Sequence, residues 1–310
     1  MLQLDLGSIF SPGLQRHTDW ESVSQFFLMM LRLRSSFAAL LLLLTAPFGF
    51  SAPANPDDTL KELVTRQNAL FAEANKNDPN FDQENFRSQL QQICNAYDVL
   101  LRDHPKMATV YVAYGLLLNK VDMRKEAASM FVQANLIDKN IPLVKNQIGN
   151  YLAEEGKPLE AVSYYLSAIQ LAPKEPLYHY QLGTLLTEAR QDFLISGEWT
   201  REGVDKAMHE AFRQAMELSP GSLPHAYRYG ESFYDLERPD WDEALEFWRS
   251  LELKAAAGVE KETIRLHEAN VLIEQKKFDQ ARDLIVSVTE KALEGQKQKL
   301  IAKLPSGKTK

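Results

Sequence analysis

Residues of the types that usually carry out catalysis are few and scattered in this 310-residue chain. The six histidines form no HExxH motif and no cluster with Cys94, the single cysteine. Neither a glycine-rich phosphate loop nor a GxSxG nucleophile motif occurs. We therefore expect no enzymatic activity, no metal and no cofactor, and the chemistry left to the chain is recognition by hydrogen bonds and ion pairs. The histidines are His17, His104, His179, His209, His225 and His267.

Charge and composition narrow the class of protein further. The formal net charge of −7 at pH 7 argues against bulk nucleic-acid binding. A single cysteine excludes a disulfide within the chain and a cysteine-based zinc site. Leu, Ala, Gln, Glu and Lys dominate, and strand-like alternation is scarce, so we expect an all-α protein.

Two neighbouring segments, residues 108–141 and 142–175, share a pattern of small, aromatic and proline residues. In the second segment Ala161, Tyr165 and Ala168 stand four and three residues apart, which places them on one helix face. Pro173 then ends the helix, because proline lacks an N–H and clashes in a helix interior. A shift of 34 residues superposes the segments without a gap, matching Tyr114, Gly115, Leu118, Ala127, Phe131 and Ala134 with Ile148, Gly149, Leu152, Ala161, Tyr165 and Ala168.

This 34-residue period resembles the tetratricopeptide repeat (TPR), a helix–turn–helix unit. Most signature positions of the family are met in residues 142–175, although Lys145 stands where a Trp is usual. The resemblance implies an all-α fold: a right-handed α-solenoid of about six antiparallel helix pairs, a TPR-like superhelix, over residues 58–294. The units are expected at residues 58–107, 108–141, 142–175, 176–222, 223–261 and 262–294.

The small residues of the repeat are expected to have a packing role. In this family the small residues lie where the two helices of a unit cross, since only a small side chain lets the backbones approach there. We expect Gly149 and Ala161 at such a crossing, with the Tyr165 ring beside Ala161 and in contact with the next unit. Ala168 is expected to let the next unit dock.

The unit at residues 176–222 is 13 residues longer than the repeat, with the surplus around residues 189–201. Because 13 residues make close to two extra turns on each helix, we expect an elongated helical hairpin with Ser196 and Gly197 at its corner. An alternative is an enzyme with a concealed site in this hairpin, carried by Glu198, Trp199 and Arg201.

By resemblance to the family, the first helix of each pair lines a concave face on which a peptide segment or helix binds. An equal alternative is that these exposed positions are solvated or contact the protein's own flanking helices. The carboxylate clamp of some TPR cochaperones is not expected, because Asn146 and Pro224 replace its two lysines; Arg228 remains a candidate partner for an acidic or terminal carboxylate. The expected groove residues are Asn146, Asn150, Tyr180, Gln181, Thr184, Tyr227, Arg228, Glu231 and Tyr234.

The N-terminal region indicates export. Residues 1–29 have no clear helical pattern and are expected to be an over-extended gene start or a disordered leader. Residues 30–54 combine a basic start, an apolar run and small residues, which predicts a signal peptide cleaved near Ala54. The expected location is therefore the periplasm or cell envelope. The alternative is that residues 31–50 are retained as a membrane anchor.

The C-terminal residues 295–310 form a basic tail that is expected to cap the last repeat, with a short helix at Leu300–Leu304. Contact of this tail with anionic lipid or an acidic protein is the alternative. Together these features predict a non-catalytic interaction scaffold or adaptor of the cell envelope whose partner is another protein or peptide. The competing hypothesis is a membrane-anchored assembly subunit of an envelope complex.

Overall fold

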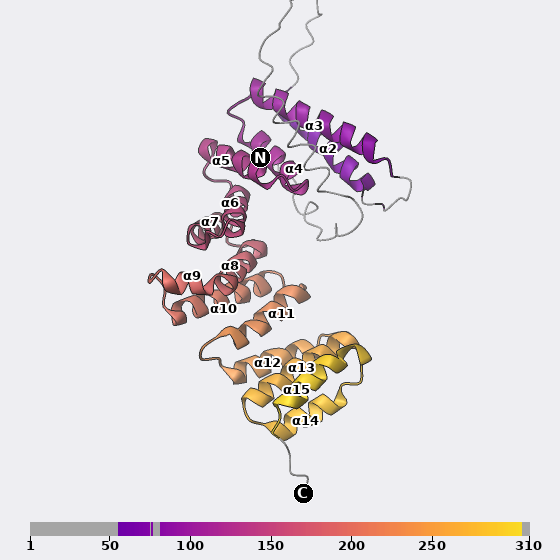
Figure 1. Ribbon diagram of the computed structural model, residues 1–310, viewed down its shortest axis with the longest axis vertical. Helices are drawn as coiled ribbons and strands as arrows, with labels where there is room; N and C mark the ends of the chain where they lie inside the picture. The colour runs from indigo at the N-terminus through magenta and orange to yellow at the C-terminus, as the bar shows by residue number, and fades with distance from the viewer. Residues whose placement is uncertain (1–54, 75, 77–80, 306–310) are drawn as a thin grey trace, which may run out of the picture. The chain divides into compact units, whose positions relative to one another are not determined.

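The structure is a computed structural model that describes residues 55–74, 76 and 81–305 (Figure 1). Within these residues the regular structure is helical and no strand occurs, so the expected all-α class is confirmed. The chain divides into two compact units, residues 1–151 (unit 1) and 152–310 (unit 2). The predicted leader at residues 1–29, the signal peptide at 30–54 and residues 306–310 of the tail lie outside the described residues. No described helix is both long and apolar enough to cross a bilayer.

Unit 1 contains two helical hairpins with an apolar interior. Helix α2 packs against α3, and α4 packs against α5. Tyr97 of α3 joins the two hairpins: its ring stacks on Tyr114 with centroids 4.9 Å apart, and its hydroxyl donates to the buried Gln67 at 2.9 Å. The bounds are α2 Pro56–Ala74, α3 Gln83–Asp103, α4 Ala108–Lys120, α5 Arg124–Ile137 and α6 Pro142–Glu154, whose last three residues belong to unit 2.

Unit 2 is a succession of helices in which neighbours in sequence pack together. Contacts join α7 to α8, α8 to α10, α10 to α11, α12 to α13 and α13 to α14. Within the two units, contacts between the helices of a pair join α2 to α3, α4 to α5, α8 to α10, α11 to α12 and α13 to α14, as expected for a solenoid of helix pairs. The bounds are α7 Pro158–Leu171, α8 Pro176–Glu188, α9 Arg190–Ile195, α10 Arg201–Leu218, α11 Leu223–Ser232, α12 Trp241–Glu252, α13 Val259–Glu274, α14 Phe278–Ser287 and α15 Glu294–Lys303, with short 3-10 turns at Phe233–Asp235 and Lys291–Leu293.

Side-chain caps and prolines set where these helices begin. The Thr200 hydroxyl accepts the backbone N–H of Gly203 at 3.0 Å at the start of α10, and the Asp240 carboxylate accepts two backbone N–H groups at the start of α12. Each cap satisfies donors that have no partner within the helix. Helices α7, α8 and α11 instead carry a proline in their first turn, where its missing N–H costs nothing.

A glycine of the first helix lies under an aromatic ring of the second helix in three of the pairs. A Cβ added at Gly115 would meet the Phe131 ring at 2.8 Å, one at Gly183 would meet Phe212 at 2.7 Å, and one at Gly230 would meet Trp248. The glycine has no side chain and thus leaves the space that the aromatic ring fills. The two helices of the pair can therefore lie close together with this space occupied.

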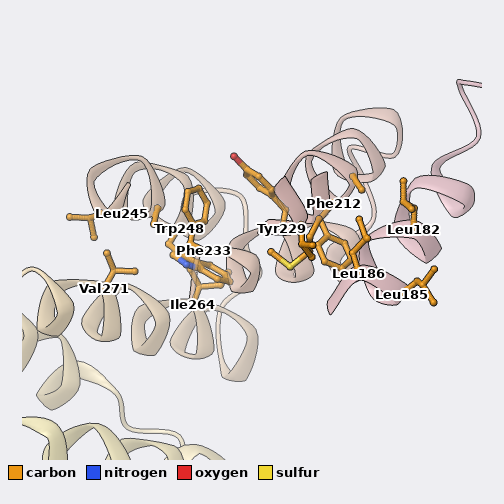
Figure 2. Close-up of a cluster of buried hydrophobic side chains, with 14 of the residues drawn as sticks. Leu182, Leu185, Leu186, Phe212, Tyr229, Phe233, Leu245, Trp248, Ile264 and Val271 are labelled. Carbon is orange, nitrogen blue, oxygen red and sulfur yellow. The ribbon is translucent and has the colours of Figure 1, made fainter. Parts of the chain in front are cut away.

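The rings of Phe212 and Trp248 belong to the core of unit 2 (Figure 2). Phe212, Phe233 and Trp248 are buried at 1 % exposure or less. Leucines from α8 and α12 and branched residues from α13 surround them, which makes one contiguous core from α8 to α13. The labelled members are Leu182, Leu185, Leu186, Phe212, Tyr229, Phe233, Leu245, Trp248, Ile264 and Val271.

The surplus residues of the 176–222 segment form a helical hairpin whose first arm is broken. Helix α8 ends at Glu188 and the six-residue α9 follows after Ala189, so the expected uninterrupted first arm is wrong. The corner lies where expected, since Gly197 has a φ of +74°, a conformation that glycine adopts without strain. The second arm, α10, has 18 residues against 14 in α5 and α7.

A buried ion network holds this hairpin in place. The Asp205 carboxylate accepts Arg201 Nε at 2.8 Å and the backbone N–H of Glu237 at 2.8 Å, and Arg190 lies 3.3 Å away. The Arg201 guanidinium also donates to the backbone oxygen of Asp235 at 3.0 Å. Arg201, a candidate catalytic group if the hairpin held an enzyme site, is therefore engaged in tying α10 to the segment that follows α11.

The C-terminal tail forms a longer helix than predicted. Helix α15 starts at Glu294 rather than near Leu300, and it packs on α13 and α14. Leu293 is buried with Leu266 and Val288, and Lys297 donates to the backbone oxygen of Val288 at 2.7 Å.

Candidate functional site

Three histidines of the described residues are held by neighbouring groups of the protein. His179 lies 2.9 Å from the backbone oxygen of Pro173, and His209 lies 2.7 Å from the Ser232 hydroxyl. His267 stacks on Trp248 with centroids 4.2 Å apart, and burial lowers the pKa of His267 to about 4. Among the residues that the structure describes, no three His, Cys, Asp or Glu side chains come together to hold a metal ion.

The predicted groove residues of unit 2 come from two successive first helices, α8 and α11. We call the set Tyr180, Thr184, Tyr227, Arg228, Glu231 and Tyr234 the first-helix face. Each of the six side chains is half-buried. Along α11 and the 3-10 turn that follows it, residues 227, 231 and 234 stand four and three apart, which places them on one side. A contact from Arg228 to Thr187 joins this side to α8.

The tyrosines of this face are fixed by neighbouring rings and backbone oxygens. Tyr180 packs edge-on against Phe212, with centroids 5.8 Å apart. The Tyr227 hydroxyl donates to the backbone oxygen of Glu260 at 3.3 Å, and the Tyr234 hydroxyl donates to that of His267 at 3.2 Å. Burial raises the pKa of Tyr227 to about 12 and also raises the pKa of Tyr234, so both remain neutral hydrogen-bond donors.

Arg228 is held within the protein. Its guanidinium pairs with Asp235 at 3.2 Å, donates to the Thr187 hydroxyl at 2.9 Å and lies 4.3 Å from the centre of the Phe212 ring. The guanidinium side chain is only 20 % exposed. With its charge balanced by Asp235, Arg228 does not present a free cation for a terminal carboxylate, which strengthens the argument against a carboxylate clamp.

Glu231 differs from Arg228 because no described residue pairs with its charge. Its carboxylate makes no hydrogen bond and no ion pair with any residue that the structure describes, although the side chain is half-buried. Burial raises the pKa of Glu231 above its usual value; Arg228 opposes this rise and Asp235 adds to it. The face therefore contains one internally neutralised cation and one carboxylate that is not neutralised.

The last member of the first-helix face is Thr184, and three predicted groove residues, Gln181, Asn146 and Asn150, lie outside this set. Thr184 uses its hydroxyl on the backbone oxygen of Tyr180 at 3.0 Å, and Gln181 is half-buried on the same helix. Asn146 and Asn150 lie on α6 within unit 1. Asn146 has no exposed surface, so the expectation that it is exposed on a groove is wrong. The resemblance to the repeat family assigned it to an exposed position, whereas the packing around α6 buries it.

Sequence reasoning missed the residues that shape the face from α13. His267 contacts the rings of Tyr227 and Tyr234, at centroid distances of 5.9 and 6.2 Å. Further along α13, Lys303 of α15 lies 2.8 Å from the Asn270 side-chain oxygen and 3.9 Å from the Glu274 carboxylate. Nothing in the local sequence around His267 signals its contacts with Tyr227 and Tyr234, because these partners are more than 30 residues away.

Comparisons with solved structures give the class of fold. The structure of Pseudomonas aeruginosa PilF is similar to this one with a TM-score of 0.53 and 16 % identity, over 80 % of this chain and 98 % of that one. YrrB, described as a TPR protein with an unusual peptide-binding site, has a TM-score of 0.51 and 14 % identity, over 67 % and 93 %. A chain of the Naa15/Naa10 complex bound to HypK-THB has a TM-score of 0.51 and 14 % identity, over 80 % of this chain and 34 % of that one.

These likenesses confirm the predicted fold: the chain is an all-α solenoid of the TPR type. At such identities the likeness extends to the fold alone. No protein-family model matches the chain, and no curated protein matches its sequence.

Proposed function

We propose that this protein is a non-catalytic interaction scaffold or adaptor of the cell envelope that binds a peptide segment or helix of another protein on its first-helix face. The observation that carries this proposal is the surface of Tyr180, Tyr227 and Tyr234, whose rings are held by neighbours while each residue stays partly exposed. Rigid tyrosines supply contact area at low entropic cost, as in other protein-binding surfaces. The TPR-type fold supports the proposal by analogy only.

The envelope location rests on the predicted signal peptide at residues 30–54. The alternative is a membrane-anchored assembly subunit in which residues 31–50 persist. N-terminal sequencing of the protein recovered from cells separates the two: a start at Asn55 excludes the anchor, and a start before Leu31 excludes cleavage.

The binding proposal is tested by replacing tyrosines of the face. Full-length chain carrying Tyr180→Ala and Tyr227→Ala is compared with wild type for retention of partner proteins by affinity capture from envelope extract. Tyr164→Ala, on the second helix α7, is the matched control because it removes the same side chain from another surface. Loss of a partner in the double variant alone supports the face; equal capture by all three proteins refutes it.

A further inference from the structure

Glu231 lies at the centre of the first-helix face without a cation of its own. Tyr227 precedes it by four residues and Tyr234 follows it by three, so the two rings flank the carboxylate on one side of the helix. The nearest cation, Arg228, is committed to Asp235 and to Thr187. Glu260 adds further negative charge near Tyr227, and His267 is neutral near pH 7. The surface around Glu231 therefore has an excess of negative charge.

The equivalent surface of the next pair already holds a lysine. Ala269 occupies the place in α13 that Gly230 occupies in α11, so Asn270 corresponds to Glu231 and Glu274 to Asp235. Lys303 Nζ lies 2.8 Å from the Asn270 oxygen and 3.9 Å from the Glu274 carboxylate. On α13 the chain's own basic helix α15 thus places a cation against the residue that corresponds to Glu231. On α11 the cation Arg228 pairs with Asp235, the counterpart of Glu274, and no described residue makes a hydrogen bond or ion pair with Glu231.

We infer that the α11 surface binds a lysine or arginine side chain of the partner segment, with the cation opposite Glu231 and between the rings of Tyr227 and Tyr234. This inference rests on the proposed function and specifies its ligand as a basic segment. A cation here makes a charge-assisted hydrogen bond to the carboxylate, and the flanking tyrosines contact the apolar part of its side chain. The partner's cation would take, beside Glu231, the place that Lys303 Nζ takes beside Asn270 on α13.

The test is selection of random displayed dodecapeptides on the immobilised full-length chain. Wild type is expected to enrich peptides that carry Lys or Arg at one recurrent position. Glu231→Gln keeps the shape of the side chain and removes its charge, so the enrichment is expected to disappear; Glu231→Lys is expected to favour Asp or Glu at that position. Glu246→Gln, the same change on the exposed side of α12, is the control and is expected to behave as wild type.

A selected peptide is then measured by fluorescence polarisation beside its Lys→norleucine version. Wild type is expected to bind the lysine peptide about tenfold more tightly than the norleucine peptide, and Glu231→Gln is expected to bind the two alike. Peptides that lose affinity with Tyr227→Ala but show no Lys or Arg preference would overturn this inference and leave the binding face intact. Peptides whose affinity is unaffected by Tyr227→Ala would overturn both.

Discussion

The indole of Trp248 packs directly over the Cα of Gly230, so that the second helix of this pair rests on the one residue of the first helix that has no side chain. The same relationship joins Gly183 to Phe212 and Gly115 to Phe131. A small residue and a large ring are therefore complementary halves of one contact in each of these pairs.

Gly230→Ala is expected to destabilise unit 2 by about 1–3 kcal/mol, because the added Cβ overlaps the buried Trp248 ring and the ring cannot move away in a close-packed core. Thermal unfolding followed by circular dichroism measures the effect. Gly221→Ala is the control, since a Cβ there meets nothing within 4 Å. Equal melting temperatures for the two variants would contradict the packing account.

Glu268 makes the stability of unit 2 depend on pH. The side chain is 3 % exposed between Arg249 and Glu252, and burial together with the Glu252 charge raises the pKa of Glu268 to about 7. The folded-state pKa of Glu268 lies above the unfolded value of 4.5. The protonated Glu268 carboxyl therefore contributes fully to the free energy of unfolding below about pH 4.5, and this contribution is lost as the pH rises through 7. Glu268→Gln should remove this loss, a gain of up to ~3 kcal/mol above pH 7.

Denaturant unfolding of wild type and Glu268→Gln from pH 4 to pH 8 measures the difference. The variant is expected to gain relative to wild type as the pH rises. Glu246→Gln, on the exposed side of α12, should show no such trend. A constant difference between wild type and Glu268→Gln at all pH values would exclude the titration of this carboxyl as the cause.

His267 is expected to titrate well below an ordinary histidine. Its burial against Trp248 lowers the pKa of His267 to about 4, so the folded state holds the imidazole neutral. Because the folded-state pKa of His267 is depressed, the neutral imidazole contributes to the free energy of unfolding above about pH 6.5. This contribution is lost as the pH falls toward 4. Nuclear magnetic resonance of the imidazole nitrogens measures the midpoint directly. The same residue in the urea-unfolded chain is the reference, and a midpoint near 6.5 in both states would refute the burial argument.

Asp205→Asn is expected to loosen the elongated hairpin by about 3 kcal/mol. Removing the buried carboxylate leaves Arg190 and Arg201 without their shared partner and weakens the tie to the backbone of Glu237. Limited proteolysis near Gly197 should become faster, and the melting temperature should fall. Asp192→Asn, an exposed change on α9, should alter neither. Unchanged cleavage in Asp205→Asn would mean that apolar packing alone holds the hairpin.

Much of the architecture could be predicted from residue types and spacing. The 34-residue recurrence identified helix pairs and the glycine, alanine and aromatic positions that the core uses. These signals are local: a helix presents the same side every three to four residues, and Gly197 is suited to a turn wherever it occurs. The excess length around residues 189–201 likewise indicated an extended hairpin, although the break after Glu188 left no clear trace.

The character of the candidate site was decided by tertiary structure. The sequence by itself determined that this chain folds into stacked helix pairs and that Tyr180, Tyr227, Arg228, Glu231 and Tyr234 stand on first helices. It did not determine that Asn146 is buried, that Arg228 is neutralised by Asp235, or that Glu231 is left without a cation. Helical periodicity states which side of one helix a residue occupies. Whether that residue meets solvent, a counter-charge or a ring depends on how the neighbouring helices are rotated and spaced, and those are set by packing contacts between residues far apart in the chain.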